Sequence, residues 1–329
     1  MSSIKDVAKI ANVSVSTVSK VMKGYSTISE DTKARVLKAI NELNYMPNAV
    51  ASALSSKVNK RIAILMNINS NTQAIDEISM QYLHGAISTA KVGGLELVTV
   101  FFSMLDGKDV SEIETYFISQ NISGIVIFGL SKEDYELHAL ITNGRFKTVV
   151  VDANFVNESS SSVSINHRKA QMDVALETIK GHNCQAILYI KGKNNGYVTQ
   201  DRLDGILELS EELNLKCIVV DGNFSELQAR ELTKKYAKEV GAIICASDLM
   251  AIGAMKMLVE MDIFRPVCGF DGITLMGYVG KQMNTVKQDF YNIASAAVLE
   301  ANLLLEGNLG REVVLEHTLE RLKYIDIIR

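Results

Sequence analysis

Residues 4–24 determine the structure expected at the start of the chain. Their sequence is Ile4-Lys-Asp-Val-Ala-Lys-Ile-Ala-Asn-Val-Ser-Val-Ser-Thr-Val-Ser-Lys-Val-Met-Lys-Gly24. The spacing of apolar residues predicts two short helices joined by a tight turn at Asn12-Val13. Ser14 suits the N-cap of the second helix, because its hydroxyl can accept from a free backbone amide, and Gly24 suits its end. The apolar stripe of the first helix is Val7, Ala8 and Ala11.

The second helix is expected to have two different faces. At about 100° per residue, Val18, Val21 and Met22 share one side, and Val15, Ser16 and Lys20 share the other. The second side offers a methyl group, a hydroxyl and an ammonium, which suit thymine methyls, base edges, and guanine or phosphate in a major groove. An ordinary helical hairpin with a polar solvent face has the same spacing.

A family resemblance favours the DNA-binding interpretation. Asp6-Val7-Ala8 followed by Val13–Ser19 resembles the helix-turn-helix of the lactose-repressor/galactose-repressor (LacI/GalR) family. The match continues through residues 43–54 and, more weakly, to about residue 306. The resemblance implies a homodimeric transcription regulator that binds a palindromic operator and answers to a small effector. The DNA contacts that it implies are Val15, Ser16, Thr17, Lys20, Tyr45, Asn48 and Leu54.

A third helix and a hinge are expected to complete the DNA-binding part. Ser29 is a suitable cap for the third helix, whose core stripe is predicted to be Val36, Leu37, Ile40 and Leu43. Pro47 then breaks the pattern, and 48–55 is a short helix candidate that is marginal alone. In the family this hinge helix orders in the minor groove, where its leucine, here Leu54, wedges into a base step. A plain linker is the alternative.

From Arg61 onward apolar strands alternate with helices, which predicts parallel sheets covered on both faces. The fold class is therefore α/β, and the resemblance implies an all-α helix-turn-helix head on a two-lobed core like a periplasmic sugar-binding protein. The polar, Ser-rich stretch Asn154–Ser164 is interpreted as a crossing between lobes. The predicted boundaries are 1–46 for the head, 47–59 for the hinge and linker, 60–155 with 291–320 for the N-terminal lobe, and 156–290 with 321–329 for the C-terminal lobe.

Composition and charge agree with this division. Residues 1–60 hold nine Lys/Arg and four Asp/Glu, a net +5, whereas the remainder holds 25 and 34, a net −9. A basic head fits contact with phosphate. No run approaches the ~18 apolar residues of a membrane span, and the N-terminus lacks a signal-peptide pattern, so a cytoplasmic protein with no membrane partner is expected. The four scattered cysteines are interpreted as reduced core thiols.

Polar residues at predicted strand ends indicate where a ligand would bind. Asp152, Ser247-Asp248 and Asp271 each follow an apolar run, and Arg202 opens a predicted helix. In open α/β sheets ligands bind beyond the carboxyl ends of strands. Carboxylates that accept from hydroxyls, with an arginine that donates, suit a sugar. A strand-end Asp is also a common helix cap.

The resemblance extends this set residue by residue. It implies an effector, expected to be a sugar or sugar phosphate, bound by Asp152, Arg202, Phe224, Ser247, Asp271, Gln288 and Phe290. Asp248 is interpreted as the cap of the following helix. Ile78 and Ser79 depart from the family, because many relatives place ligand-stacking aromatic residues there.

Other chemistry is not indicated. The histidines have no metal-ligand spacing, and no nucleophile, P-loop or cofactor motif stands out, so neither a metal, a cofactor nor an enzymatic activity is expected. The five histidines are 84, 138, 167, 182 and 317. Two alternatives remain: a core that answers to a protein partner such as a phosphocarrier protein, and a sugar-handling enzyme with an appended DNA-binding head.

Overall fold

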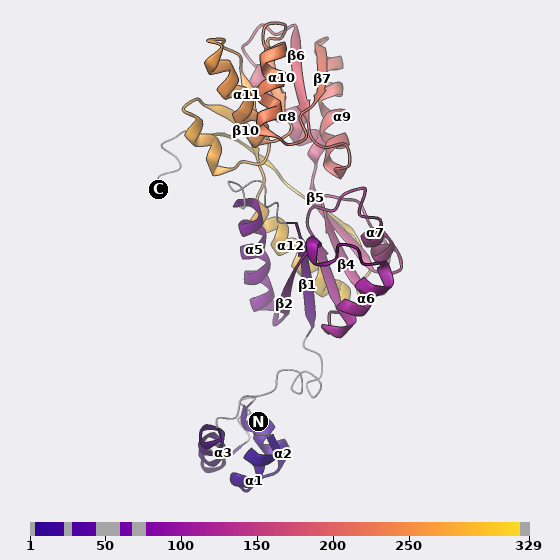
Figure 1. Cartoon of the computed structure of the whole chain (residues 1–329), viewed down its shortest axis with the longest axis vertical. Coiled ribbons are helices and arrows are strands. Elements are labelled where there is room, and N and C mark those ends of the chain that lie inside the picture. Colours follow the sequence, from indigo (N-terminus) through magenta and orange to yellow (C-terminus); the bar gives the residue numbers. More distant parts are fainter. Residues whose placement is uncertain (1–3, 23–27, 44–59, 68–76, 323–329) are drawn as a thin grey trace. The chain divides into compact units, whose positions relative to one another are not determined.

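The computed structural model describes residues 4–22, 28–43, 60–67 and 77–322. Backbone contacts divide the chain into two compact units, Met1–Asn59 and Lys60–Arg329 (Figure 1). The predictions for Gly24, Tyr45, Asn48 and Leu54, and for the hinge at 47–59, lie outside the described residues.

The first unit contains the three helices that the sequence predicts. They are α1 (Ile4–Ile10), α2 (Val15–Met22) and α3 (Glu30–Glu42). Asn12 makes the turn with a left-handed φ of 52°, a conformation that Asn tolerates. The Ser14 cap is confirmed, because its Oγ accepts from Thr17 N at 3.1 Å. The Ser29 cap is confirmed in the same way by Thr32 N.

One predicted core position in this unit is wrong. Leu37 is 54% exposed, whereas Val36 and Ala39 are buried. Ala39 and Ile40 lie three and four residues after Val36 and share its face of α3, while Leu37 is rotated by about 100° from it. The buried cluster is Val7, Ala8, Ala11, Val18, Val21, Val36 and Ala39.

The second unit begins with a parallel six-stranded sheet of order β11-β5-β4-β3-β1-β2. Its strands are β1 (Arg61–Met66), β2 (Glu96–Phe101), β3 (Gly124–Ile127), β4 (Lys147–Val151), β5 (Ser160–Ile165) and β11 (Glu312–Leu315). Helices α5 (Glu77–Gly93) and α12 (Phe290–Leu305) pack together on one face, and α6 (Val110–Ser119) and α7 (Tyr135–Thr142) cover the other. We call this sheet and its helices the first lobe.

A second six-stranded sheet has the order β12-β10-β9-β8-β6-β7. Its strands are β6 (Ala186–Lys191), β7 (Lys216–Asp221), β8 (Ala242–Cys245), β9 (Val267–Cys268), β10 (Met283–Lys287) and the antiparallel β12 (Thr318–Leu322). Helices α8 (His167–Ile179) and α9 (Tyr197–Glu212) pack as one pair, and α10 (Glu226–Tyr236) and α11 (Asp248–Glu260) as another. The 3-10 helix η2 (Thr274–Val279) lies beside this sheet, whereas η1 (Phe102–Met104) follows β2 in the first lobe. We call the second sheet and its helices the second lobe.

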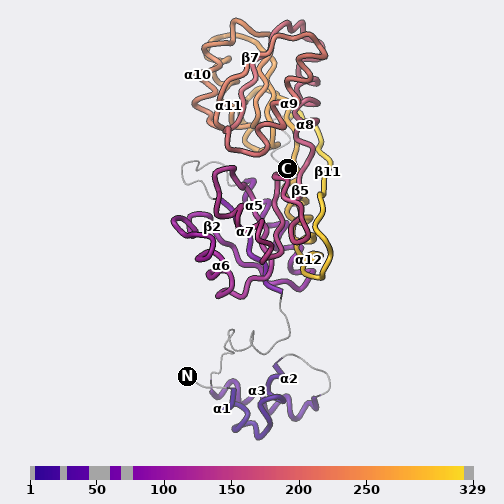
Figure 2. Tube along the Cα trace, turned by 90° about the vertical axis from the view of Figure 1, so that its right-hand side faces the viewer, coloured from indigo at the N-terminus to yellow at the C-terminus, as the bar shows by residue number. Residues whose placement is uncertain are grey.

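The predicted crossing at Asn154–Ser164 is wrong for most of its length. Ser160–Ile165 form β5, which pairs with β4 and β11 inside the first sheet. Three serines of this strand are buried, and Ser162 Oγ donates to Ala153 O at 3.0 Å. The strand was missed because its serines interrupt the apolar run. Figure 2 shows β11 beside β5.

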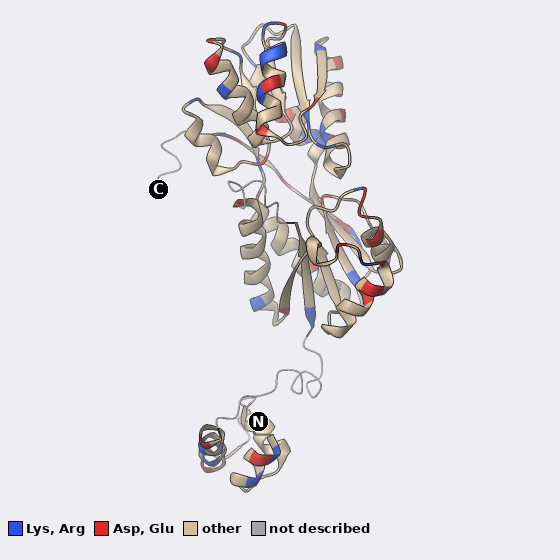
Figure 3. Ribbon diagram, in the orientation of Figure 1, with Lys and Arg blue, Asp and Glu red and all other residues tan. Residues whose placement is uncertain are grey.

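Charged residues follow the division between surface and core. In Figure 3 most Lys, Arg, Asp and Glu lie on helices and loops, and the strands are largely other residue types. All four cysteines are free. Cys245 and Cys268 are buried, as the interpretation of core thiols predicts, whereas Cys184 and Cys217 are half-buried.

Among the described residues, no helix combines the length and the apolar character that a membrane span needs.

Candidate functional site

The outer face of α2 is arranged as the sequence predicts. Val18 and Val21 are buried, whereas Val15, Ser16 and Lys20 are exposed. Thr17 is half-buried, and its Oγ1 lies 2.8 Å from Ser14 Oγ. A methyl group, a hydroxyl and an ammonium are therefore presented together on one short helix.

In the second unit, the ends of both sheets place five polar side chains in contact. We call them the polar cluster: Asp152, His167, Arg202, Asp271 and Gln288. Asp152 follows β4 of the first sheet, with a left-handed φ of 61°. The others come from the second lobe or from the segment that leaves it. The structure therefore brings together four of the seven predicted effector residues and adds a histidine.

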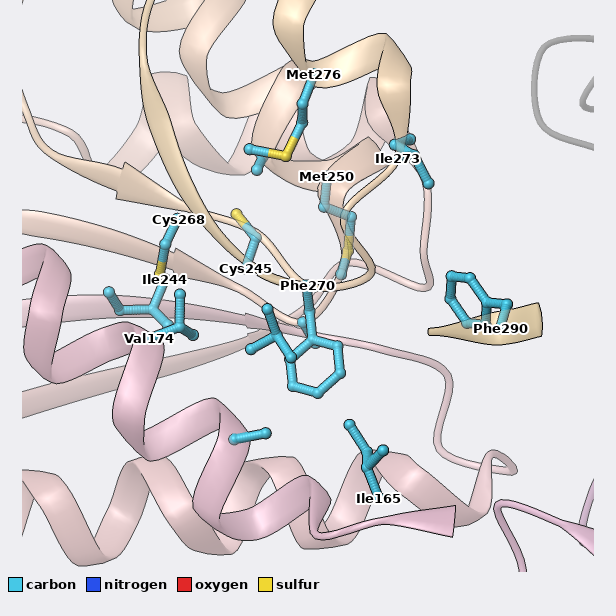
Figure 4. Packing of buried hydrophobic residues seen from close by; sticks show 14 of the residues in the cluster. Ile165, Val174, Ile244, Cys245, Met250, Cys268, Phe270, Ile273, Met276 and Phe290 are labelled. Carbon is cyan, nitrogen blue, oxygen red and sulfur yellow. The ribbon is translucent and has the colours of Figure 1, made fainter. Parts of the chain in front are cut away.

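Arg202 lies at the centre of this cluster and is almost fully buried. Its Nη1 donates to Ala246 O and lies 4.0 Å from Asp271 Oδ1. Its guanidinium carbon is 3.6 Å from the centre of the Phe270 ring, a cation–π arrangement. Figure 4 shows Phe270 within the buried hydrophobic cluster, together with Ile165 and Phe290. Arg202 is thus fixed in place rather than free to follow a ligand.

Sequence reasoning missed His167, which lies between Asp152 and Arg202. Its Nε2 is 2.8 Å from Asp152 Oδ1, and its Nδ1 is 3.3 Å from Arg202 Nη2. Burial lowers the pKa of His167 and outweighs the nearby Asp152 carboxylate, which raises it. His167 is the first residue of α8, directly after the strand that was not predicted. A prediction of β5 would have placed it at the sheet edge.

Asp271 is held by an unusual backbone and by a neighbour. Its φ is 128°, a region that residues other than glycine rarely occupy and that marks functional sites. Gln288 Nε2 donates to its Oδ1 at 3.0 Å. Gln288 is buried, and its Oε1 has no hydrogen-bond partner among the described residues. Since buried acceptors are normally paired, this oxygen is suited to a donor from a ligand.

The role of Asp248 differs from the prediction. Ser247 is the cap of α11, accepting from Met250 N, whereas Asp248 lies inside the first turn and is fully buried. Asp248 Oδ2 accepts from the backbone amides of Gly272 and Ile273 at 2.7 and 2.8 Å. Asp248 therefore fixes the loop that carries Asp271. Burial raises the pKa of both carboxyl groups.

An aromatic wall borders the cluster on the side of the first lobe. Phe290, the first residue of α12, makes an edge-to-face contact with Tyr82 at 5.2 Å, and Tyr82 lies 4.3 Å from Phe128. Burial raises the pKa of Tyr82, and the charges of Asp152 and Asp271 raise it further. Tyr82 was missed, although it lies one turn after Ile78 and Ser79, where relatives carry aromatic residues.

Phe224 and Ser247 lie near strand ends but have other contacts. Phe224 adopts a left-handed φ of 57°, and its ring covers Gly192, where an added Cβ would lie 2.1 Å from Cζ. Ser247 is buried and its Oγ serves the cap of α11. Their roles in ligand binding stay predictions.

Two joints connect the lobes on either side of the polar cluster. In the first, Glu77 of α5 accepts from the amide and the hydroxyl of Thr274. In the second, Lys132 N donates to Asn195 O at 2.8 Å, and Asn195 Nδ2 donates to Glu133 Oε2 at 2.8 Å. These two joints consist of exposed or half-buried polar groups, and they add to the buried contact between Asp152 and His167.

A cavity of about 800 Å³ lies elsewhere in the second lobe and includes no residue of the polar cluster. Its walls come from the end of α8, the segment 262–267 and β12, and they mix positive with negative side chains. The polar cluster remains the site with convergent chemistry.

Comparison with known proteins identifies the kind of protein to which this site belongs. Residues 3–48 match the model of the bacterial regulatory proteins of the lacI family. The transcriptional regulator RegA of Clostridium saccharobutylicum, of the helix-turn-helix type, is 30% identical, over 96% of this chain and 97% of its own. The chain belongs to the LacI/GalR family. It is a DNA-binding transcription regulator.

Two further relatives of this LacI/GalR regulator are informative. The ribose operon repressor of Halalkalibacterium halodurans is 28% identical, over 90% of this chain and 88% of its own. A crystal structure of the Lac repressor dimer bound to operator and the anti-inducer ONPF superposes with a TM-score of 0.80. It is 23% identical and covers 98% of this chain and 99% of its own. The second comparison confirms the predicted fold.

Proposed function

We propose that this regulator is a homodimeric repressor of carbohydrate-utilisation genes, controlled by an uncharged sugar bound between its lobes. The observation that carries the proposal is the polar cluster. Both lobes contribute to it, and the buried Gln288 Oε1 has no donor among the residues that the structure describes. The name of the ribose operon repressor, a relative over nearly the whole chain, supports a sugar-related role.

The side chains of the cluster suit vicinal hydroxyl groups. Carboxylates of Asp152 and Asp271 accept from hydroxyls, and Arg202 has N–H groups left to donate. Asp152 and Asp271 retain 22% and 17% exposure of their side chains, so part of each carboxylate can meet a ligand. The aromatic wall of Tyr82 and Phe290 offers apolar surface for the face of a sugar ring.

The charges favour an uncharged sugar over a sugar phosphate. Arg202 is the one permanent cation of the polar cluster, against the two acids Asp152 and Asp271. Lys287 lies beside Asp271 in register but directs its Nζ to Gly272 O at 3.1 Å. A phosphate dianion would meet more repulsion than attraction here.

The head would read the operator through the exposed face of α2. Val15, Ser16, Thr17 and Lys20 are the proposed base and phosphate contacts, and two heads of a dimer would occupy two half-sites. Tyr45, Asn48 and Leu54 remain proposed contacts of the hinge. By linkage, an effector that prefers one arrangement of the lobes changes operator affinity by its affinity ratio for the two arrangements.

A thermal-shift screen of the full chain tests the effector. The panel pairs each sugar with its phosphate: ribose, glucose, galactose and fructose. A ligand at a hundred times its dissociation constant adds about 2.7 kcal/mol of stability, which raises the melting temperature measurably. We expect protection by an uncharged member and its loss in Arg202→Lys. Arg145→Lys, at an exposed ion pair with Glu114, is the matched control.

The other outcomes have distinct meanings. Stronger protection by a phosphate would contradict the charge argument while leaving a sugar effector in place. A response in wild type and Arg202→Lys alike would contradict the site. No response to the whole panel would contradict a sugar effector and favour control by a protein partner.

A further inference from the structure

His167 connects the two lobes through its two ring nitrogens. Nε2 lies 2.8 Å from Asp152 Oδ1, which belongs to the first lobe. Nδ1 lies 3.4 Å from Nε and 3.3 Å from Nη2 of Arg202, which belongs to the second. The His167 side chain is 3% exposed, so water does not compete for either nitrogen.

The partners of His167 define where its proton must be. A guanidinium has only donors and does not lose its proton in a protein, so Nδ1 has to accept from Arg202. Nε2 therefore carries the hydrogen and donates it to the Asp152 carboxylate. The chain Arg202–His167–Asp152 is complete only with a neutral imidazole in this one tautomer.

The surroundings hold this chain rigidly. The imidazole stacks on Phe270 with ring centres 5.7 Å apart, and the Arg202 guanidinium lies over the same ring. Gly205 of α9 approaches the start of α8 so closely that an added Cβ would lie 2.2 Å from Arg168 O. The backbones that carry His167 and Arg202 are therefore in van der Waals contact, and little slack separates the two side chains.

We propose that His167 is a positioning residue that joins the ligand-facing carboxylate of the first lobe and the ligand-facing guanidinium of the second in one hydrogen-bonded unit. This rests on the proposed function, in which Asp152 and Arg202 contact the effector. A movement of either lobe then disturbs both contacts, so effector affinity depends on the arrangement of the lobes.

The charged groups that act on His167 are Asp152, Arg202 and Asp201, which directly precedes Arg202 on α9. Burial has the largest effect and lowers the pKa of His167. Asp152 raises this pKa, and Arg202 lowers it by a smaller amount. A histidine that merely fills space has no requirement for one tautomer, whereas the chain Arg202–His167–Asp152 requires the hydrogen on Nε2. This difference provides a test that needs no ligand.

The test measures the ¹⁵N shifts of the imidazole in full-length protein labelled at histidine, with His167→Gln to assign the signals. We expect the neutral Nε2–H tautomer at pH 7 and a pKa below the ordinary 6.5. Removal of a neighbouring unit charge typically shifts a pKa by about one pH unit or more. Arg202→Met should therefore raise the pKa of His167, and Asp152→Asn should lower it further.

His84, which is exposed on α5 and contacts Tyr291, is the internal control. The ¹⁵N shifts of its imidazole should be the same in both variants as in wild type. An Nδ1–H tautomer, or a His167 pKa that ignores both substitutions, would overturn the proposal. Neither result would bear on whether a sugar binds.

Binding of the protecting sugar from the panel tests the consequence. His167→Phe keeps an aromatic ring and removes both hydrogen bonds, and we expect at least about tenfold weaker binding, the equivalent of one lost hydrogen bond to a charged group. His167→Asn retains an acceptor near Arg202, and His167→Gln retains a donor near Asp152. We therefore expect both variants to bind the sugar more weakly than wild type and more tightly than His167→Phe. Equal affinity of wild type and His167→Phe would overturn the positioning role even if the tautomer is as expected.

Discussion

A pair of hydrogen bonds between Glu77 of the first lobe and Thr274 of the second lobe joins the two lobes. Thr274 N donates to Glu77 Oε2 and Thr274 Oγ1 donates to Glu77 Oε1, both at 2.8 Å. Both donors go to the same carboxylate, which fixes the N-terminus of α5 against the start of η2. Because the two residues are not deeply buried, water can replace these bonds at modest cost.

A double-mutant cycle should detect this joint. We expect Thr274→Val and Glu77→Gln each to lower the free energy of unfolding by at most about 1 kcal/mol, with a coupling of about 0.5 kcal/mol or more. Urea denaturation of the four proteins measures it. Thr142→Val is the control, since Thr142 Oγ1 donates only within its own helix, to His138 O. Strict additivity would show that the joint contributes nothing in solution.

The buried His167 predicts how stability depends on pH. Its folded pKa is lowered from 6.5, so on acidification the unfolded chain takes up the proton before the folded one does. Wild type should therefore lose stability relative to His167→Gln as the pH falls below about 6.5, by at most about 1.4 kcal/mol per pH unit. Urea titrations at pH 7.5, 6.5 and 5.5 give the difference, with His84→Gln as the control. A constant difference would contradict a buried neutral imidazole.

We expect substitution by alanine to destabilise the protein by different amounts at two glycines. In Gly205→Ala the new methyl would meet the backbone oxygen of Arg168, which cannot move without shifting α8. In Gly192→Ala the three nearest atoms all belong to the ring of Phe224, a side chain that can turn away. Overpacking typically costs about 1–3 kcal/mol, and we expect Gly205→Ala at or above the upper end and Gly192→Ala near the lower. Thermal denaturation ranks them. Phe224→Leu should relieve Gly192→Ala and leave Gly205→Ala unchanged.

Lys20 predicts a specific loss of DNA affinity. Lys20→Ala should weaken binding to an operator selected from random duplexes about tenfold or more, because the ammonium lies on the exposed face of α2. Lys38→Ala on α3, where Lys38 lies 3.9 Å from Glu42, is the matched control and should change little. Fluorescence anisotropy over a range of salt concentrations separates a phosphate contact, which lowers the salt slope, from a base contact, which does not.

Sequence reasoning succeeded where a local pattern determines the structure. The helix-turn-helix depends on Asn12, Ser14 and the period of its valines, all within one short stretch. Most strands and helices of the core follow from apolar runs and caps in the same way. Asp152, Arg202 and Asp271 were found because parallel strands end at the same edge of their sheet.

Sequence reasoning failed where contacts between segments that are distant in the sequence determine the structure. β5 was missed because Ser160, Ser161 and Ser162 are buried against partners that arrive from elsewhere, including Arg311, whose amide donates to Ser161 Oγ. His167 gave no signal, since its partners lie 15 and 35 residues away along the chain. Ser247 caps α11 in place of Asp248, whose carboxylate binds a loop that begins only after β9.

The strands β11 and β12 have a consequence for synthesis on the ribosome. Glu312–Leu315 complete the sheet of the first lobe, and Thr318–Leu322 follow at once to complete the sheet of the second. α12, which covers one face of the first sheet, is also made only after the second lobe. The end of β11 is made 315 − 165 = 150 residues after the end of β5. At about 5–20 residues per second, the first lobe must therefore wait about 8 to 30 seconds with an open face and an unpaired edge. Neither lobe can finish folding before nearly the whole core has emerged, so both are completed within the same few residues.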